Sequence, residues 1–431
     1  SFTNRKNDSL IMFNQINYPS RSEYATICQR PALEQGQLDA LISNVFSQVK
    51  SKGDQALREL TATYEKREIT DILYTASEID DLASKTDTEL QKAIDHAYAN
   101  IYAFHTAQKL VPNKIEVNPG VVCWQKSTGI DKVGIYIPGG TAPLFSTVLM
   151  LAIPARIAEC QEVVLCTPAT HPAIFYAAKL CGVTKMAKVG GSQAIAALSL
   201  GTESVPAVYK IFGPGNQYVT AAKMYANRLG TAIDMPAGPS EVAVYADHTA
   251  NPAYIASDLL SQAEHGADSQ VILISTSSNI VEQTIAEINL QLAQLPRKDL
   301  AEKALANSKF VLVNTAAEAI DLLNEYAAEH LILACDNAEE FSEHIRNAGS
   351  IFLGHFTPES AGDYASGTNH TLPTNGFARA YSGVNLDSFT KKITLQSITK
   401  QGLEQLGQTI IDMAEAESLQ AHANAVKIRL S

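Results

Sequence analysis

The chain has 431 residues, of which 46% are hydrophobic and 18% are charged, and its formal net charge is −12. This length suggests about three compact units, and the hydrophobic content excludes a disordered chain. The excess of acidic residues leaves no basic footprint for a nucleic acid. No apolar run approaches the roughly 18 residues of a membrane-spanning helix, so a membrane partner is not expected either.

Cysteine usage indicates a reducing compartment. No two cysteines form a CxxC motif, and their surroundings are mostly apolar. In a chain of this size such residues are typical of reduced, buried thiols. The sequence therefore predicts a cytoplasmic protein. The six residues are Cys28, Cys123, Cys160, Cys166, Cys181 and Cys335.

Two helices are expected before any strong strand. Apolar residues recur at spacings of three and four between Leu38 and Val49, which predicts a helix within residues 32–66. A second helix is expected from Thr86, where Thr86–Glu89 has the pattern of a capping box, and its apolar stripe runs to Phe104.

From residue 132 onward, short β-branched runs alternate with helical stretches, which is typical of βαβ units in a parallel sheet. The first group of strands is expected at 132–137, 162–167, 187–189 and 208–212. The second group is expected at 241–246, 270–276, 309–315, 330–334 and 350–353. A boundary near residues 238–240 separates the two groups.

The predicted fold is α/β, with two Rossmann-like parallel-sheet modules and a small extended tail. Residues 22–130 and 239–382 are expected to form one α/β domain that carries the candidate metal and catalytic residues. Residues 131–238 are expected to form a nucleotide-binding α/β domain, and residues 1–21 and 383–431 to form tail segments involved in dimerisation. Composition alone also allows the alanine-rich helix near 403–424 to dock on its own domain.

Three glycine-containing turns follow strands of the first module and lead directly into helices. Helix N-termini with exposed glycine amides favour phosphate groups, and a parallel sheet binds ligands at the carboxyl ends of its strands. Each turn is also compatible with a tight βα connection that binds nothing, and neither a G-x-G-x-x-G nor a GxxxxGK[ST] pattern is present. Three turns with a polar or aromatic neighbour (Tyr136, Gln193 and Asn216) favour a nucleotide site. The turns are Tyr136–Gly140, Val189–Gln193 and Phe212–Asn216.

Two polar pairs lie in the second module. Gln262 and His265 share one helix face and could ligate a metal, although a histidine hydrogen-bonded at a helix end is an alternative. Glu329 and His330 precede an apolar run, where a carboxylate beside an imidazole suits acid/base chemistry. A solvated strand end is the alternative for this second pair.

Two further segments are rich in polar residues. Residues 358–370 have almost no apolar bulk and contain Asp363, Asn369 and His370, so we expect this segment to bind a ligand. Glu417 and His422 lie on the tail, together with Glu415. On composition alone these residues form a solvent-exposed helix face.

Six segments together resemble the histidinol dehydrogenase family, and the resemblance covers nearly the whole chain. The agreement of all six segments in order makes the resemblance specific. The segments are Tyr136–Gly140, Ile211–Asn216, Asp234–Glu241, Ser257–His265, Glu329–His330 and Glu359–His370.

The resemblance implies an NAD- and zinc-dependent oxidoreductase. Its reaction would be the four-electron oxidation of L-histidinol to L-histidine through L-histidinaldehyde, the last step of histidine biosynthesis. A homodimer with one Zn²⁺ per subunit and an active site shared between subunits is implied as well. The use of NAD over NADP follows from the resemblance alone.

The resemblance also assigns roles to residues. The implied catalytic pair is Glu329 and His330, with His330 as the base for the hydroxyl proton and Glu329 as the activator of water. The implied metal ligands are Gln262, His265, Asp363 and, from the partner's tail, His422. Cofactor contacts map to Tyr136, Gln193 and Asn216. Substrate contacts map to Ser240, Gln262, His265, Glu329, His330, Asp363, His370, Glu417 and His422.

Two functions from other classes stay open on the residues alone. A zinc hydrolase could use the same ligand set with a metal-bound water and Glu329 as base, but it would leave the glycine turns without a role. A non-catalytic protein could bind a nucleotide or a metal on the same α/β scaffold.

Overall fold

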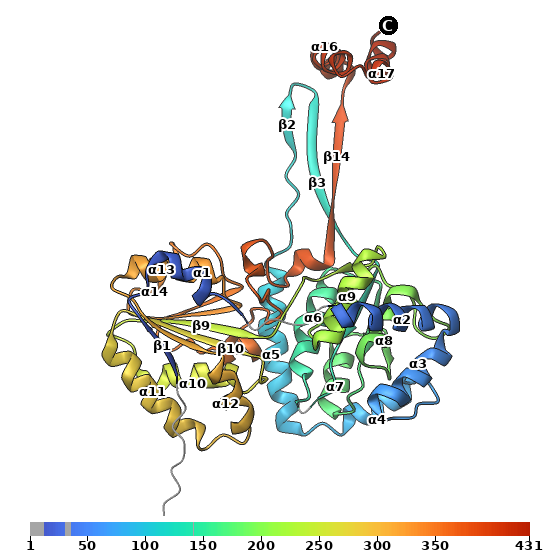
Figure 1. Cartoon of the computed structure of the whole chain (residues 1–431). Helices are drawn as coiled ribbons and strands as arrows, with labels where there is room; N and C mark the ends of the chain where they lie inside the picture. The colour runs from blue at the N-terminus through green and yellow to red at the C-terminus, as the bar shows by residue number, and fades with distance from the viewer. Residues whose placement is uncertain (1–12, 31–35, 141) are drawn as a thin grey trace, which may run out of the picture.

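The computed structural model describes residues 13–30, 36–140 and 142–431. Two parallel sheets, each covered by helices on both faces, form two lobes, and a ribbon that ends in two helices protrudes from them (Figure 1). The prediction of two parallel-sheet α/β modules with an extended tail is therefore confirmed. No helix in the described ranges is both long enough and apolar enough to cross a membrane.

The five-stranded sheet has the order β6-β5-β4-β7-β8, and all its pairings are parallel. This is a doubly wound order, in which the chain reverses direction across the sheet between β4 and β7. The strands are β4 (Lys132–Tyr136), β5 (Glu162–Cys166), β6 (Lys185–Ala187), β7 (Lys210–Phe212) and β8 (Ala232–Ile233). The helices between them are α6 (Phe145–Ile157), α7 (Pro172–Cys181), α8 (Gly191–Leu200) and α9 (Gln217–Arg228).

The six-stranded sheet has the order β1-β11-β10-β9-β12-β13 and is also parallel throughout. Its last five strands repeat the doubly wound order, and β1 (Asn14–Asn17) extends one edge. The other strands are β9 (Glu241–Ala246), β10 (Gln270–Ser275), β11 (Lys309–Leu312), β12 (His330–Ala334) and β13 (Ser350–Leu353). The helices of this lobe are α1 (Tyr24–Ile27), α10 (Pro252–Ala263), α11 (Ser278–Leu292), α12 (Lys298–Ala306), α13 (Ala316–Tyr326), α14 (Ala338–Ser342) and α15 (Glu359–Tyr364).

The helices that precede the first sheet differ from the prediction in two ways. The expected helix at 32–66 begins outside the described residues and is broken at Gly53, whose φ is +55°, into α2 (Gly36–Lys52) and α3 (Asp54–Leu60). The second helix, α5 (Thr88–Thr106), begins two residues later than expected, because Asp87 rather than Thr86 caps it. A shorter helix, α4 (Ala76–Ser84), lies between them.

The helices that precede the five-stranded sheet pack mainly on the helices of that sheet. The helices α2 and α3 pack on α8 and α9, while α4 and α5 pack on α7 and α6. They therefore cover the five-stranded sheet, and α5 also contacts the other lobe, where Asn100 donates to the carbonyl oxygen of Ala365 and His105 contacts Asn369. Residues 14–17, expected in a tail, form a strand of the six-stranded sheet. The apolar stripe of a helix shows that one face is buried but not which sheet buries it. Residues 1–12 of the expected tail lie outside the described residues.

The ribbon was not predicted from the sequence. It is an antiparallel sheet of β2 (Ile115–Asn118), β3 (Val121–Gly129) and β14 (Thr390–Ile398), with β3 in the centre. Beyond it lie α16 (Lys400–Ala416) and α17 (Gln420–Leu430), which pack on each other far from the two lobes (Figure 1). The tail therefore pairs with residues 121–129, and its helical end consists of two helices.

Candidate functional site

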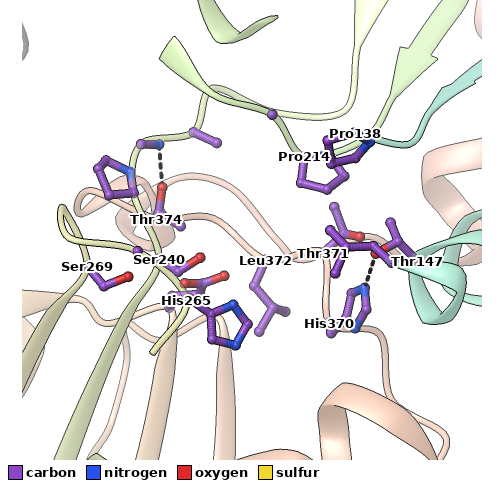
Figure 2. Close-up of a pocket in the computed structure, with 18 of the residues that line it drawn as sticks. Pro138, Thr147, Pro214, Ser240, His265, Ser269, His370, Thr371, Leu372 and Thr374 are labelled. Carbon is purple, nitrogen blue, oxygen red and sulfur yellow. Dashed lines mark hydrogen bonds between the residues drawn. The ribbon is translucent and has the colours of Figure 1, made fainter. Parts of the chain in front are cut away.

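A cavity of about 390 Å³ lies between the two lobes. One wall contains the turns after β4 and β7, at the carboxyl ends of the five-stranded sheet, as the sequence predicted. The opposite wall contains Ser240, Ser269, Glu329 and His330, which lie at the amino ends of β9, β10 and β12. Figure 2 shows Pro138 and Pro214 facing Ser240 and His265 across this space.

The glycine turn after β7 is shaped by close packing. Gly213 has a φ of +133°, and a Cβ there would lie 2.1 Å from the carbonyl oxygen of Tyr136. Asn216 then caps α9, because its Oδ1 accepts hydrogen bonds from the backbone N–H groups of Tyr218 and Val219. This wall therefore offers a glycine turn and a helix N-terminus, a combination that suits an anionic group such as a phosphate.

A buried ion pair supports this turn. Lys223 and Asp234 form the pair, and both side chains are at most 6% exposed. The Nζ of Lys223 donates to the carbonyl oxygen of Gly213 at 2.9 Å, and Asp234 accepts from the N–H of Gly213 at 2.9 Å. Sequence reasoning missed this pair, because Lys223 lies on α9 and Asp234 follows β8, and only the fold brings both to Gly213.

The other two expected cofactor residues lie beside a different turn. The hydroxyl of Tyr136 accepts from the N–H of Gly191 at 3.0 Å, and Gln193 donates to Glu65 at 2.8 Å. Both side chains are buried and neither lines the cavity, although Oε1 of Gln193 has no hydrogen-bond partner. Of the three expected cofactor residues, only Asn216 lines the cavity.

Three of the four expected metal ligands lie on the opposite wall. Gln262 is at the end of α10, His265 follows it, and Asp363 lies on α15. The side chain of Gln262 is fully buried, yet neither its Oε1 nor its Nε2 has a hydrogen-bond partner. A buried amide costs free energy unless it is bonded, so the side chain of Gln262 is suited to bind a ligand in the cavity.

Glu359 is a site residue that the sequence analysis did not assign. Its carboxylate, the imidazole of His265 and the carboxylate of Asp363 each place one ligand atom within 4.8 Å of the others. Glu359 and Asp363 are four residues apart on α15, a spacing that puts both on one helix face and could have signalled the pair. Burial raises the pKa of Glu359 to about 8.

The expected catalytic pair lies where β12 begins. The Nδ1 atom of His330 is 3.3 Å from the carbonyl oxygen of Glu241, and Oε2 of Glu329 accepts from the N–H of Glu241 at 2.9 Å. The Nε2 atom of His330 lies 3.4 Å from Oδ1 of Asp363. Both members of the pair are buried, so the alternative of a solvated strand end is wrong.

Negative charge exceeds positive charge around His330. Burial alone would lower the pKa of His330, but the carboxylates of Glu329, Glu359 and Asp363 outweigh it and raise that pKa to about 10. Burial has the opposite effect on a carboxyl group and raises the pKa of Glu329 to about 7. Three carboxylates around one imidazole, next to an amide and a second imidazole, form an oxygen and nitrogen donor set that fits a divalent cation such as Zn²⁺.

His370 joins the two lobes at the edge of the cavity. Its Nδ1 is 2.8 Å from the carbonyl oxygen of Asp363, and its Nε2 is 3.0 Å from the hydroxyl of Thr147 on α6 (Figure 2). Ser240, one of the residues expected to contact the substrate, also lines the cavity.

The two tail residues do not reach this cavity. Glu417 ends α16 and His422 lies on α17, at the far end of the ribbon (Figure 1). Neither lines the cavity of its own chain. The chain by itself therefore brings together Gln262, His265 and Asp363, but not His422.

The fold and the site define a two-sheet α/β protein. In its cavity, a glycine turn that suits a phosphate group faces a buried cluster of imidazoles and carboxylates. The family profile described as histidinol dehydrogenase matches residues 28–430. Histidinol dehydrogenase of Bacteroides thetaiotaomicron is 55% identical over 425 residues, which cover 97% of this chain and 99% of that protein.

Further comparisons agree. Histidinol dehydrogenase of Vibrio vulnificus is 49% identical over 95% of this chain and 96% of its own. The crystal structure of histidinol dehydrogenase from Elizabethkingia anophelis superposes with a TM-score of 0.95 and 52% identity, covering 97% of this chain and 98% of that chain. The chain belongs to the histidinol dehydrogenase family of oxidoreductases.

The Lys223–Asp234 pair generates a prediction about stability. Lys223→Met leaves the carboxylate of Asp234 buried without a cation, which should lower the free energy of unfolding by about 3–5 kcal/mol. Arg228→Met, on the same helix, removes an exposed pair with Asp39 and should cost at most about 0.5 kcal/mol. Urea unfolding of both variants measures the difference, and equal losses would contradict the role assigned to the buried pair.

Proposed function

We propose that this protein oxidises L-histidinol to L-histidine through L-histidinaldehyde, using NAD and a bound Zn²⁺, as the last step of histidine biosynthesis. Membership of the histidinol dehydrogenase family supports the substrate. The observation that carries the proposal is the orphaned amide of Gln262 beside His265 and Asp363, on the wall that also holds Glu329 and His330. A hydrolase would leave the opposite wall, with its glycine turn and helix N-terminus, without a role, and a binding module would leave the buried pair Glu329 and His330 without one.

Gln262, His265 and Asp363 would hold the zinc, and the turn at Gly213–Asn216, with Tyr136 and Gln193 nearby, would hold NAD. When bound, the zinc supplies a cationic centre that orients the amine and imidazole of the substrate, and NAD supplies a hydride acceptor. Ser240, His370 and Glu417 are proposed as further substrate contacts.

His330 is the proposed base for the alcohol oxidation. Its Nδ1 faces the carbonyl oxygen of Glu241, which favours the tautomer with the proton on Nδ1. The surrounding carboxylates raise the pKa of His330 to about 10, so the imidazole stays protonated near neutral pH unless a cation offsets their charge. A zinc held by His265 and Asp363 would offset that charge, and Nε2 would then have the lone pair that accepts the hydroxyl proton.

Glu329 is the proposed base for the aldehyde oxidation, in which water must add before the second hydride leaves. Burial holds its pKa near 7, so the carboxylate can take a proton from water near neutral pH and release it afterwards. The hydrogen bond from the N–H of Glu241 keeps one carboxylate oxygen in place.

A second copy of the chain is proposed to complete the site with His422 and Glu417. Its tail extends away from its own cavity, and apolar side chains on the ribbon and the two tail helices are exposed: Val117 at 55%, Met413 at 63% and Ile428 at 72%. Such surfaces mark sites of association. The cysteines within the described ranges are all unpaired, which is consistent with the proposed cytoplasmic location.

A shared site predicts complementation between inactive variants. His265→Ala and His422→Ala should each be nearly inactive, because each lacks one ligand in every site. Mixed and reassembled, the two should form heterodimers with one intact site and recover activity with L-histidinol and NAD. Absence of recovery in verified heterodimers would contradict the shared site.

The division of roles predicts a step-specific effect of Glu329→Gln. This variant keeps the shape of the side chain but cannot accept a proton from water. The rate of L-histidinaldehyde oxidation should therefore fall by about 100-fold or more. The rate of the first oxidation of L-histidinol should fall less. Single-turnover kinetics with the two substrates measure both steps, and an equal loss would show that Glu329 does not activate water.

A further inference from the structure

Glu241 gives both of its peptide groups to the proposed catalytic pair. Its N–H donates to Oε2 of Glu329 at 2.9 Å, and its carbonyl oxygen lies 3.3 Å from Nδ1 of His330. One residue at the start of β9 therefore sets the position of the carboxylate and the orientation of the imidazole. Any shift of this peptide unit moves both groups together.

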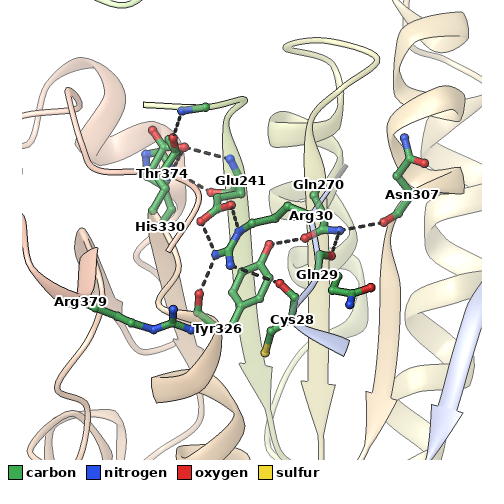
Figure 3. A network of polar contacts seen from close by, with 12 residues as sticks. Cys28, Gln29, Arg30, Glu241, Gln270, Asn307, Tyr326, His330, Thr374 and Arg379 are labelled. Atoms are coloured by element: carbon green, nitrogen blue, oxygen red, sulfur yellow. Dashed lines mark hydrogen bonds and ion pairs between the residues drawn. The ribbon is translucent and has the colours of Figure 1, made fainter. Parts of the chain in front are cut away.

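The side chain of Glu241 points away from the cavity and is held by Arg30. Nε of Arg30 donates to Oε2 of Glu241 at 2.7 Å, and Nη2 donates to Oε1 at 2.8 Å (Figure 3). The arginine and glutamate side chains are 11% and 2% exposed. A bidentate pair of this kind restricts both the distance and the orientation of the carboxylate.

Arg30 is itself anchored to two other parts of the lobe. Its guanidinium also donates to the carbonyl oxygens of Tyr326, at 2.6 Å, and Cys28, at 3.3 Å, and lies 4.1 Å from the centre of the Tyr326 ring. The hydroxyl of Tyr326 donates to Gln270 on β10 at 2.8 Å. Figure 3 shows this network running from His330 through Glu241 and Arg30 to Gln270.

The position of Tyr326 ties the network to the catalytic pair a second time. Tyr326 ends α13, and only Ala327 and Ala328 separate it from Glu329. Arg30 therefore joins the end of the helix that precedes the pair to the strand whose backbone orients it. Neither Arg30 nor Glu241 lines the cavity, so they act through other residues.

We propose that Arg30 and Glu241 are positioning residues for the oxidation reaction: their buried ion pair fixes the peptide groups of Glu241, and these orient Glu329 and His330. The inference rests on the proposed function, because the reaction that the pair affects is the proposed oxidation of L-histidinol. It predicts a defect in turnover with little change in substrate binding, because the proposed ligands of zinc and substrate are left intact.

The test uses a double variant that keeps the fold. Arg30→Met alone would leave the Glu241 carboxylate buried and unpaired, whereas Arg30→Met/Glu241→Met replaces the pair with apolar groups of similar size, which is often neutral for stability. We expect kcat with L-histidinol and NAD to fall about tenfold or more in the double variant while KM changes by about twofold or less. Arg21→Met, which removes an exposed pair with Asp321 in the same lobe, is the matched control and should keep the parent's kcat.

Hydrogen exchange supplies a readout that does not depend on activity. In the double variant the backbone amide of residue 241 should exchange about tenfold faster or more than in the parent, while amides of β5 in the other lobe keep the rate of the parent. If kcat and the exchange rate of the amide at position 241 both stay within about twofold of the parent in the double variant, the proposal is overturned. The parent is assayed in parallel: if it does not oxidise L-histidinol, the proposed function fails, and the exchange result still decides whether the pair fixes Glu241.

Partial rescue separates positioning from packing. Arg30→Lys keeps a cation but only one point of contact, so its kcat should lie between those of the parent and Arg30→Met. Added methylguanidinium should raise the kcat of Arg30→Ala, which leaves space for it. A kcat of Arg30→Lys no higher than that of Arg30→Met, together with no response to methylguanidinium, would contradict a role for the guanidinium.

Discussion

The site depends on two parallel sheets that present opposite ends to one cavity. Helices α6 and α9 begin at the wall formed by the five-stranded sheet, so their N-termini face the cavity side. Helices α10 and α13 end at the wall formed by the six-stranded sheet. Helix N-termini favour anions and helix C-termini favour cations. The two walls therefore suit, respectively, the phosphates of a nucleotide and a metal ion.

The same arrangement explains why charges can be buried on both walls. Around Gly213, a single lysine balances one aspartate, and both also bond to the turn. Around His330, the negative charge of three carboxylates exceeds the positive charge of the imidazole. The side-chain oxygen of Gln262, which has no hydrogen-bond partner, is a further group that could bind a cation. The first centre balances its charges within the chain, whereas the second carries an excess of negative charge.

Much of the fold could be predicted from the sequence, because β-branched runs and glycine turns report local structure. The turn at Phe212–Asn216 and the pair Glu329–His330 were both found in this way, and both line the cavity. The sequence placed that pair at the start of its strand, but it did not predict that this end of the second sheet faces the carboxyl ends of the first. The rule that ligands bind at carboxyl ends applies within one doubly wound sheet, and here a second sheet supplies the opposite wall.

What the sequence could not supply are contacts between distant segments. The pairing of β14 with β3 and the packing of α4 and α5 on the five-stranded sheet depend on surfaces that periodicity does not identify. Arg30 and Glu241 are 211 positions apart, and nothing near either residue indicates the other. Glu359 could have been identified as a site residue from the sequence, since its four-residue spacing from Asp363 on α15 is a local signal.

The most direct test of the account measures how much NADH forms for each L-histidinol consumed, with the reaction run to completion before and after removal of metal. The account predicts two NADH per L-histidinol, loss of the reaction on chelation and recovery with Zn²⁺, because both oxidations occur at one metal-dependent site. One NADH per substrate would contradict a second oxidation involving Glu329. No NADH from folded, zinc-loaded protein would contradict the proposed function as a whole.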